Sequence, residues 1–425
     1  MKLRVTPWYI LLKKLIRGIV VPNLRDRLNR IRELKKIEVP QAVNSLSDDV
    51  PALIDCGWVN CGFKTMKREI TVDTPLKFQT SLPPALAVVV PDLARRNLPE
   101  LEDFLFFDLE TTGLSGGAGT AAFLAAFGRI VSREKLRITQ YLLLDYPGLN
   151  DFLENALKEF KENSVITSYN GKCFDSSILK TMCLMNGIRP PEYFHADLLH
   201  PARRLWKNII SDCSQGSIET QILGLDRGGD IPGALAPEIW FDFLRTGRTE
   251  RLLGICDHNS ADIAGLASIL AAMISIASDP FDCGYRYDIQ RLALYWRDFL
   301  RRTEQTENTD LQITGNKLLR FTAEKNYPNA AFVYALDHLR SGNFEEGRER
   351  LLDIVKSSFP ENIKASALRT LAIDSERRLK CFEEALGFVK HGLELEAGAF
   401  WKNEFERRKE RLEKKLRPDN QRPPP

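Results

Sequence analysis

The sequence is poor in cysteine and histidine and has no strong excess of either charge. Its 425 residues include eight cysteines, and no two of them form a Cys-x-x-Cys pair, which excludes a dense disulfide scaffold and a cysteine-paired zinc site. The 60 Lys and Arg nearly balance the 57 Asp and Glu, so any basic surface must be local. We expect buried, reduced thiols in a cytoplasmic protein.

Long apolar runs and phosphate-loop patterns are also missing. The most apolar N-terminal stretch, residues 8–21, is interrupted by three basic residues, and a membrane-spanning helix needs about 20 apolar residues. The same charges argue against a signal peptide. The dipeptide Gly171-Lys172 lacks the flanking residues of a Walker motif. We therefore expect neither membrane association nor a nucleotide-binding loop of that kind.

The length predicts two or three domains, at about 100 to 200 residues each. Near the N-terminus, Leu24, Leu28 and Ile31 recur at helical spacing among arginines. This pattern indicates a basic amphipathic helix that contacts nucleic acid or a partner, or that lies solvated on the body of the protein. A Pro-rich, irregular stretch follows, and we expect it to be a small extension packed on the next domain. We assign residues 1–99 to this helix and extension, 100–278 to an α/β domain, 285–406 to helical repeats and 407–425 to a charged, Pro-rich tail.

Strand and helix patterns alternate regularly in the second of these segments. Apolar runs predict three successive strands that pair antiparallel, over residues 104–109, 120–130 and 136–145. Beyond them we expect helices over 151–162 and 174–186, strands over 165–169 and 194–198, and only helices from there to 278. This order of elements is that of the ribonuclease H-like α/β fold.

Two short segments beyond residue 285 repeat each other. Residues 343–347 read Asn-Phe-Glu-Glu-Gly and residues 381–385 read Cys-Phe-Glu-Glu-Ala, and each opens an amphipathic helix that another helix precedes. Two helices per repeat resemble tetratricopeptide (TPR) repeats, although the interval of 38 residues exceeds the usual period of about 34. The pattern predicts a TPR-like array that recruits a partner or guides a substrate.

The strongest sign of chemistry is a pair of carboxylates at the end of an apolar strand. Side chains of a strand alternate between faces, so Asp108 and Glu110 project the same way after the apolar residues 104–107. An isolated Asp-x-Glu is usually a solvated turn. Here the apolar run before the pair and the Thr-Thr-Gly-Leu after it favour a divalent cation, which would relieve the repulsion between the two acids.

Three further residues complete a candidate metal site, because two cations that hold the oxygens of a phosphoryl transfer need more than two carboxylates. Asp175 follows an apolar strand and begins a helix, where an aspartate that only interacts with the helix dipole is the alternative. His258 and Asp262 share one face of a long helix because they are four residues apart. Imidazoles ordinarily change protonation near neutral pH, so His258 is a candidate to accept a proton from the attacking water.

The order of the candidate site residues resembles the motifs of the DEDD superfamily of 3′-to-5′ exonucleases. These residues are Asp108, Glu110, Asp175, His258 and Asp262. Five segments look more narrowly like the YprB (MrfB) family of bacterial nucleases, namely residues 108–114, 170–175, 195–206, 230–233 and 258–263. The resemblance covers about residues 100–275. It implies two Mg²⁺ or Mn²⁺ ions held by the four carboxylates, and a link to DNA repair beside a helicase partner. Histidine-branch members usually have five residues from the histidine to the last aspartate, whereas this sequence has four.

Weaker candidates surround these residues. Leu114 corresponds to the position that wedges against the terminal base in DEDD nucleases, and we group Thr111 and Thr112 with it as substrate-binding candidates. A local basic cluster either holds phosphates or is a solvated helix face; it consists of Arg203, Arg204 and Lys207.

The sequence therefore predicts a cytoplasmic, metal-dependent exonuclease that acts on nucleic acid, on DNA in preference to RNA. One rival is an RNA exonuclease, because no residue that reads a 2′-hydroxyl is recognisable. Another rival is a non-catalytic adaptor that binds protein through its helical repeats. The four clustered acids argue against an adaptor, which would have no use for them.

Overall fold

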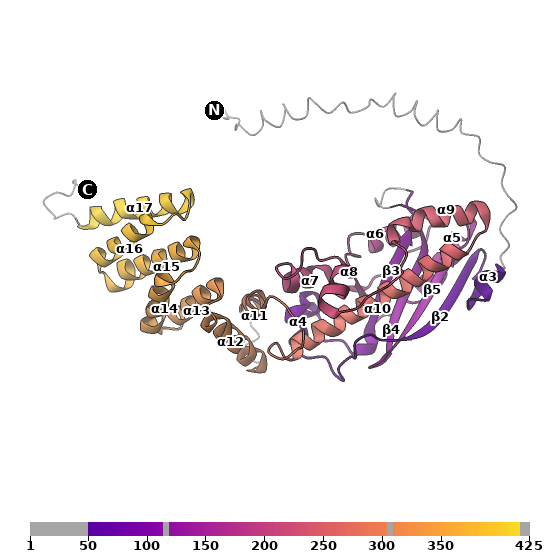
Figure 1. Cartoon of the computed structure of the whole chain (residues 1–425), viewed down its shortest axis with the longest axis horizontal. Coiled ribbons are helices and arrows are strands. Elements are labelled where there is room, and N and C mark those ends of the chain that lie inside the picture. The colour runs from indigo at the N-terminus through magenta and orange to yellow at the C-terminus, as the bar shows by residue number, and fades with distance from the viewer. Residues whose placement is uncertain (1–49, 114–118, 304–308, 417–425) are drawn as a thin grey trace, which may run out of the picture.

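The computed structural model describes residues 50–113, 119–303 and 309–416. The basic helix expected near residues 24–32, Leu114 and the tail after residue 416 lie outside these ranges. Within them, an α/β domain built on one sheet is followed by a succession of helices that leads away from it (Figure 1).

One mixed sheet of seven strands forms the centre of the α/β domain. β3 (Phe104–Thr111), β4 (Ala122–Ser132) and β5 (Lys135–Leu143) pair antiparallel, as the sequence predicted. β6 (Val165–Ser168) and β7 (Phe194–Asp197) lie parallel to β3 on its other side. The strand order β5-β4-β3-β6-β7 and the helices between the strands agree with the predicted ribonuclease H-like architecture.

Two more strands extend this sheet where the sequence predicted a small packed extension with a short strand-like run at residues 69–72. β1 (Trp58–Gly62) and β2 (Thr65–Asp73) form a hairpin, and β2 pairs along its whole length with β5. The strand pattern of β2 is weak because Arg68 occupies one of its buried positions. Its partner strand is also distant in the sequence, so no local signal reveals the pairing.

The helices divide between the α/β domain and the region that follows it. Those of the α/β domain are α3 (Pro51–Ile54), α4 (Leu86–Val89), α5 (Leu149–Leu157), α6 (Asp175–Met185), α7 (Leu199–Trp206), α8 (Gln215–Ile218), α9 (Ala236–Thr246) and α10 (Glu250–Ser278). Those that follow are α11 (Ile289–Thr303), α12 (Thr309–Glu324), α13 (Pro328–Arg340), α14 (Phe344–Lys356), α15 (Glu361–Asp374), α16 (Phe382–Glu394) and α17 (Ala399–Leu416).

The two faces of β3 pack against different helices. Leu105, Phe107 and Leu109 belong to a core shared with α5, α6 and α9. Phe104 and Phe106 belong to the other core, which includes α7 and most of the apolar residues of α10. Because alternate residues of a strand share a face, Asp108 and Glu110 point to the side that α10 covers.

Helix α10 crosses this face of the sheet (Figure 1). Among the described residues it is the one helix long and apolar enough to cross a membrane, but 78% of its apolar window is buried inside the protein. Its composition is therefore accounted for by its place in the core. The helix comes close to β4 at Gly128, where a Cβ atom would collide with Ile263. This close approach brings Asp262 over the end of β3.

Helices α11 and α12 pack on the core of the α/β domain, across the expected division at residues 278–285. Their buried apolar side chains lie in the same cluster as Phe106 and Trp206, and include Leu292, Trp296 and Leu318. The backbone N–H of Asp288 donates to the carbonyl of Leu205 at 2.8 Å. The first two helices of the helical region are thus structurally part of the α/β domain.

The remaining helices form antiparallel pairs at the predicted repeats, although their assignment as TPR units stays a prediction. Helices α13 to α17 bury their apolar residues mainly in two clusters of their own. Gly347 and Ala385, which share one offset in the repeat, are both buried. A Cβ atom at Gly347 would lie 2.7 Å from Leu339, so the small residue lets two helices cross closely.

A protein truncated after Ser278 is expected to lose much of its stability, because it exposes a core that α11 and α12 cover. Loss of a single large buried apolar side chain typically costs about 2 to 5 kcal/mol, and Leu292, Trp296 and Leu318 are all nearly inaccessible. A protein truncated after Tyr327 keeps these helices and serves as the control. Urea unfolding followed by circular dichroism should show a much lower midpoint for the shorter protein. Equal midpoints would mean that α11 and α12 contribute nothing to this core.

Candidate active site

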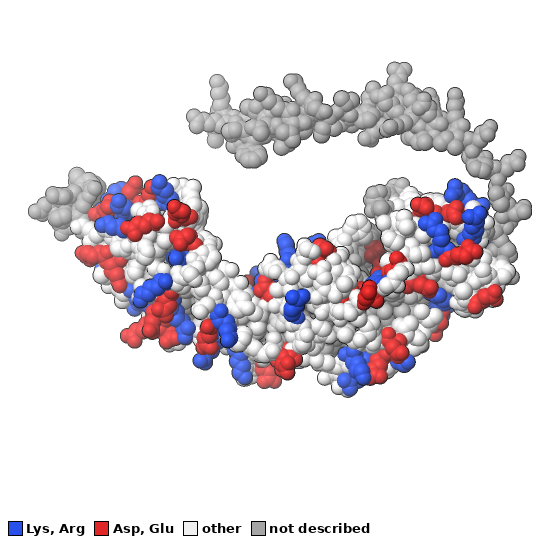
Figure 2. Space-filling model, viewed as in Figure 1, with Lys and Arg blue, Asp and Glu red and all other residues white. Residues whose placement is uncertain are grey.

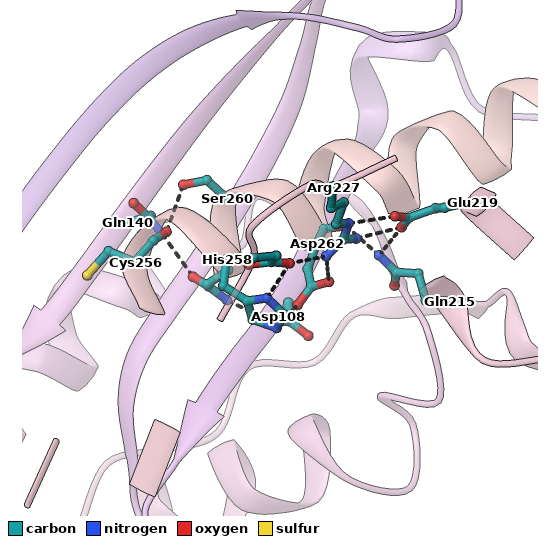
Figure 3. A network of polar contacts seen from close by, with 11 residues as sticks. Asp108, Gln140, Gln215, Glu219, Arg227, Cys256, His258, Ser260 and Asp262 are labelled. Carbon is teal, nitrogen blue, oxygen red and sulfur yellow. Dashed lines mark hydrogen bonds and ion pairs between the residues drawn. The ribbon is translucent and has the colours of Figure 1, made fainter. Parts of the chain in front are cut away.

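Four acids from three elements meet beside the end of β3. Asp108 and Glu110 lie near the end of β3, Asp175 is the first residue of α6, and Asp262 lies on α10. Because β6 is parallel to β3, the loop that follows β6 emerges at the same edge and delivers Asp175 there. Asp175 and Asp262 both repel the carboxylates of Asp108 and Glu110 electrostatically. Figure 3 shows Asp108, His258 and Asp262 at the centre of a polar network along α10.

These acids are strongly perturbed by their surroundings. Burial raises the pKa of Asp108 well above its usual range, that of Glu110 to about 8 and that of Asp175 to about 7. Repulsion by neighbouring carboxylates adds to the shifts in pKa of Asp108 and Glu110. Across the described ranges, no Lys or Arg forms an ion pair with any of these three acids. Buried oxygen donors that repel one another and lack a cation fit divalent metal ions.

One group of donor atoms is already close enough to surround an ion. Ligand atoms of Glu110, His258 and Asp262 all lie within 4.8 Å of one another. This geometry brings together the first and last motifs that the sequence singled out. It also leaves two roles open to His258, as a ligand or as a proton acceptor, which the experiments below separate.

His258 is oriented by a carboxylate on each side of its ring. Its Nδ1 lies 2.7 Å from Oδ2 of Asp230, and its Nε2 lies 3.2 Å from Oδ2 of Asp262. The segment that supplies Asp230 packs tightly under the ring, since a Cβ atom at Gly233 would lie 2.8 Å from Nε2. Asp230 therefore holds Nδ1, and Nε2 is the nitrogen that faces the acid cluster. This contact gives a physical role to the Asp-Ile-Pro-Gly segment at residues 230–233.

Asp262 is fixed from the other side by an arginine. Arg227 Nη1 donates to Oδ1 of Asp262 at 2.6 Å, and Arg227 Nη2 and Nε donate to the two oxygens of Glu219, also at 2.6 Å. Glu219 is 2% exposed, so it balances the guanidinium in a buried site. This pair lies directly against α10 at Gly265, where a Cβ atom would collide with Glu219.

Asp108 is held by a chain of buried side chains that runs across the sheet (Figure 3). Asn259 Nδ2 donates to Oδ2 of Asp108 at 2.7 Å, and Gln140 Nε2 donates to Oδ1 of Asn259 at 3.0 Å. Arg68 on β2 donates in turn to Oε1 of Gln140 through Nη2 at 2.8 Å. Gln140 and Asn259 are fully buried, so these hydrogen bonds replace the ones that their amides would make with water. The added β1–β2 hairpin thus supports a residue of the acid cluster.

Asp175 is positioned by the loop between β6 and α6. Asp197 accepts hydrogen bonds from the backbone N–H groups of Asn170 at 2.8 Å and Lys172 at 3.1 Å, which is a structural use of both its oxygens. A Cβ atom at Gly171 would lie 2.8 Å from Oδ2 of Asp175. Glycine is therefore needed for the carboxylate to lie so close to the loop. His195 is partly buried beside this loop, and the loss of solvent around it lowers its pKa to about 4.

The weaker sequence candidates lie elsewhere or have other partners. The Thr111 hydroxyl donates to the carbonyl of Gly113 at 2.9 Å, and the Thr112 hydroxyl accepts from the N–H of Ala121 at 3.0 Å, so both stabilise the turn after β3. Leu114 is outside the described residues. The basic cluster lies on α7, which faces α11 instead of the acid cluster.

Sequence reasoning missed the residues that support the site. They are Arg68, Gln140, Glu219, Arg227 and Asn259. Arg68, Gln140 and Asn259 contact partners far along the chain, whereas Glu219 and Arg227 are only eight residues apart. A lone Arg, Gln or Glu carries no sequence pattern of its own. Asn259 had the clearest available signal, because it directly follows His258 in a motif already singled out.

The fold and the acid cluster define an α/β domain of the ribonuclease H type, and comparison agrees. Residues 105–274 match the family described as the RNase_H superfamily, so this stretch of the chain is similar to RNase H superfamily domains. A protein of Bacillus subtilis (strain 168) named "Uncharacterized protein YprB" is 40% identical over 175 residues. That stretch is 40% of this chain and 42% of the relative, so this chain matches less than half of the relative's length.

Metal binding is expected to release protons and to strengthen as the pH rises. The folded, ion-free protein keeps protons on Glu110 up to a pKa of about 8 and on Asp175 up to about 7, whereas the unfolded chain releases them near pH 4 to 5. These acids therefore reduce the stability of the ion-free protein as the pH rises from about 4.5 to about 8. A cation displaces the same protons.

Calorimetric titration with Mn²⁺ in buffers of different ionisation enthalpy counts these protons. At least one should be released per molecule at about pH 6.5 and fewer at about pH 9, and Glu110→Gln should reduce the number at the lower pH. An Mn²⁺ affinity that does not change between these pH values would show that the acids are ionised before the metal arrives.

Proposed function

We propose that this protein is a metal-dependent 3′-to-5′ exonuclease that hydrolyses DNA by a two-metal-ion mechanism, in a repair process. The observation that carries the proposal is the meeting of Asp108, Glu110, Asp175 and Asp262 beside His258 at the edge of a ribonuclease H-type sheet. A purely structural role does not account for buried acids that repel one another. Proteins of the RNase H superfamily are typically metal-dependent nucleases, which supports the same conclusion.

The four carboxylates would hold Mg²⁺ or Mn²⁺. When bound, two such ions supply charge neutralisation for a phosphodiester and activation of the attacking water. The chain's own residues supply the positions. Asn259 fixes Asp108, Arg227 fixes Asp262, and the loop held by Asp197 fixes Asp175.

His258 would accept the proton of the attacking water at Nε2. With Asp230 at Nδ1, the ring keeps one orientation and gains a negative neighbour that stabilises the charged imidazolium. The same arrangement of a base held by a carboxylate recurs in unrelated hydrolases. It also offers a way to keep the histidine in place although its interval to Asp262 is four residues.

The regions outside the acid cluster would serve substrate and partner. Arg203, Arg204 and Lys207 on α7 would contact phosphates, and the helical repeats would recruit a helicase or another protein. A cytoplasmic location is supported by the cysteines, all eight of which are free thiols.

A degradation assay with end-labelled DNA and RNA, single- and double-stranded, tests the proposal. Cleavage with Mg²⁺ or Mn²⁺ that stops in EDTA and shortens 5′-labelled DNA stepwise would support it. Faster cleavage of RNA would favour the RNA exonuclease. Metal-independent binding without any cleavage would favour the non-catalytic adaptor, which the helical region makes the second candidate.

A further inference from the structure

The junction between the α/β domain and the helical region carries positive charges that form no ion pair with a described carboxylate. On the face shown in Figure 2, Lys and Arg are otherwise interspersed with Asp and Glu, and arginines of the helical region such as Arg348 and Arg378 pair with Asp374. At the junction, by contrast, no described carboxylate forms an ion pair with any of a set of five cations. We call this set the α7–α11 patch, and it consists of Arg203, Arg204, Lys207, Arg286 and Arg291.

Three members of the patch form one surface, because Arg203, Arg204 and Arg291 contact one another or the same aromatic ring. Arg291 Nη1 on α11 donates to the carbonyl of Arg203 on α7 at 3.2 Å. The guanidinium of Arg204 lies 4.7 Å from the ring centre of Tyr295, and that of Arg291 lies 6.0 Å from the same ring. The backbone of Arg286 is tied to α7, since Trp206 Nε1 donates to its carbonyl at 3.1 Å. The two helices therefore present their cations together.

Two acids beside the patch already accept hydrogen bonds from other groups. Asp288 accepts hydrogen bonds from Asn208 Nδ2 at 2.7 Å and from the N–H of Arg291 at 2.9 Å, at the start of α11. Asp212 accepts from the N–H of Ser214 and the hydroxyl of Ser217, both at 2.9 Å. Arg203 and Lys207 are exposed, so their charges remain available to a ligand.

The patch also connects to the acid cluster. Burial raises the pKa of the Cys213 thiol, the charge of Asp212 adds to that shift, and those of Arg203, Arg291 and Lys207 oppose it, so Cys213 lies within electrostatic range of the patch. The hydroxyl of Tyr169 donates to the carbonyl of Cys213. Tyr169 directly follows β6 and precedes the loop that positions Asp175. A chain of contacts therefore leads from the acid cluster to the patch.

We propose that the α7–α11 patch binds the phosphate backbone of the nucleic-acid strand that extends beyond the nucleotides in the active site, so that α11 is part of the substrate-binding surface. The inference rests on the proposed function and adds to it a strand path shared by two regions of the chain. Several cations that form no ion pair with a described carboxylate and share one surface are the usual means of holding a phosphate backbone. An aromatic ring between two of them is typical of single-strand binding.

Binding is measured by fluorescence anisotropy with the full chain carrying Asp108→Asn, so that cleavage does not interfere. The probes are single-stranded oligothymidylates of about 10 and about 40 nucleotides, the longer of which exceeds a typical single-domain site. One variant neutralises α7 (R203Q with K207Q), a second neutralises α11 (R291Q), and a control neutralises two exposed cations of the helical region (R377Q with K390Q). Circular dichroism checks that each variant is folded.

A plot of log K against log salt has a negative slope. For the longer probe, each cation–phosphate interaction that a variant removes should reduce the magnitude of this slope by about 0.7. By the same rule we expect a decrease of about 1.4 for the α7 variant and about 0.7 for the α11 variant, with no change in the control and little change for the short probe. A slope that falls only for the α7 variant would remove α11 from the surface and overturn the inference. Equal slopes in the patch and control variants would also overturn the inference. That result would favour an acidic protein as the ligand of the patch.

The cleavage assay keeps this test separate from that of the proposed function. With Asp108 intact, the patch variants should lose more activity on the long probe than on the short probe at low substrate concentration. If the wild-type protein cleaves nothing, the proposed function fails while the binding slopes still test the patch. If cleavage is intact and the slopes do not change, only the patch fails.

Discussion

Asp108→Asn should abolish hydrolysis while leaving the fold and substrate binding intact. The substitution removes one negative donor from the acid cluster but keeps the side-chain volume, and its amide oxygen can still accept the hydrogen bond from Asn259. Cations in such sites contribute several kcal/mol of transition-state stabilisation, and each 1.36 kcal/mol is a factor of ten. On this basis we expect the rate of cleavage with Mg²⁺ or Mn²⁺ to fall by about 10³-fold or more.

The same substitution makes a second, opposite prediction about stability. Repulsion from three neighbouring acids and burial raise the pKa of Asp108, so a neutral amide should leave the ion-free protein at least as stable as the wild type at pH 8. The rise in Tm on adding Mn²⁺ should shrink or disappear. Asp282→Asn, an exposed aspartate near the end of α10, is the matched control and should change neither quantity. Cleavage by the pure Asp108→Asn protein at the wild-type rate would refute the assignment of the site.

His258→Ala should slow cleavage by about 10² to 10⁴, the usual value of general-base assistance, without preventing metal binding. The deficit should shrink at high pH, where hydroxide forms without help. Asp230→Asn removes the negative charge beside Nδ1, 2.7 Å away, and should give a smaller loss. Asp230 acts through the imidazole ring. In the His258→Ala background, Asp230→Asn should therefore cause almost no further loss of rate, which a double-mutant cycle measures.

Calorimetry with Mn²⁺ separates the two roles that the geometry allows His258. Retained uptake by His258→Ala would support the proton acceptor, whereas loss of uptake would make the histidine a ligand alongside Glu110 and Asp262. Additive effects of Asp230→Asn and His258→Ala would contradict the idea that the aspartate orients the ring.

The sequence predicted the strands and helices from residue 104 to 278 within a few residues, because buried strands and amphipathic helices leave local periodic patterns. It also singled out all four acids: Asp108, Glu110 and Asp175 because each follows an apolar strand, and Asp262 because it shares a helix face with His258. It could not show that β2 belongs to the sheet, because Arg68 interrupts the strand pattern and its partner Gln140 lies far along the chain. Nor could it show that α11 and α12 complete the α/β core, because amphipathic periodicity reveals an apolar face but not the surface it covers.

The supporting contacts were unpredictable for a related reason. Arg227 and Glu219 form an ion pair against α10. The sequence around them has no pattern that identifies them as partners. The segment at residues 230–233 was noticed only through a resemblance. Its physical purpose, to hold Nδ1 of His258, became visible once the loop and α10 were placed together.

The late position of α10 in the chain has a consequence for protein synthesis. A ribosome-bound polypeptide makes β3, β4 and β5 long before α10 emerges, and domains fold as units while the chain grows. Until then Asp108 and Glu110 lie on an uncovered sheet face, without His258 or Asp262. The nascent chain therefore carries three of its four acids, Asp108, Glu110 and Asp175, and lacks Asp262. Closure of α10 over the sheet is therefore the late folding step that first lets the newly made protein capture a cation with all four acids.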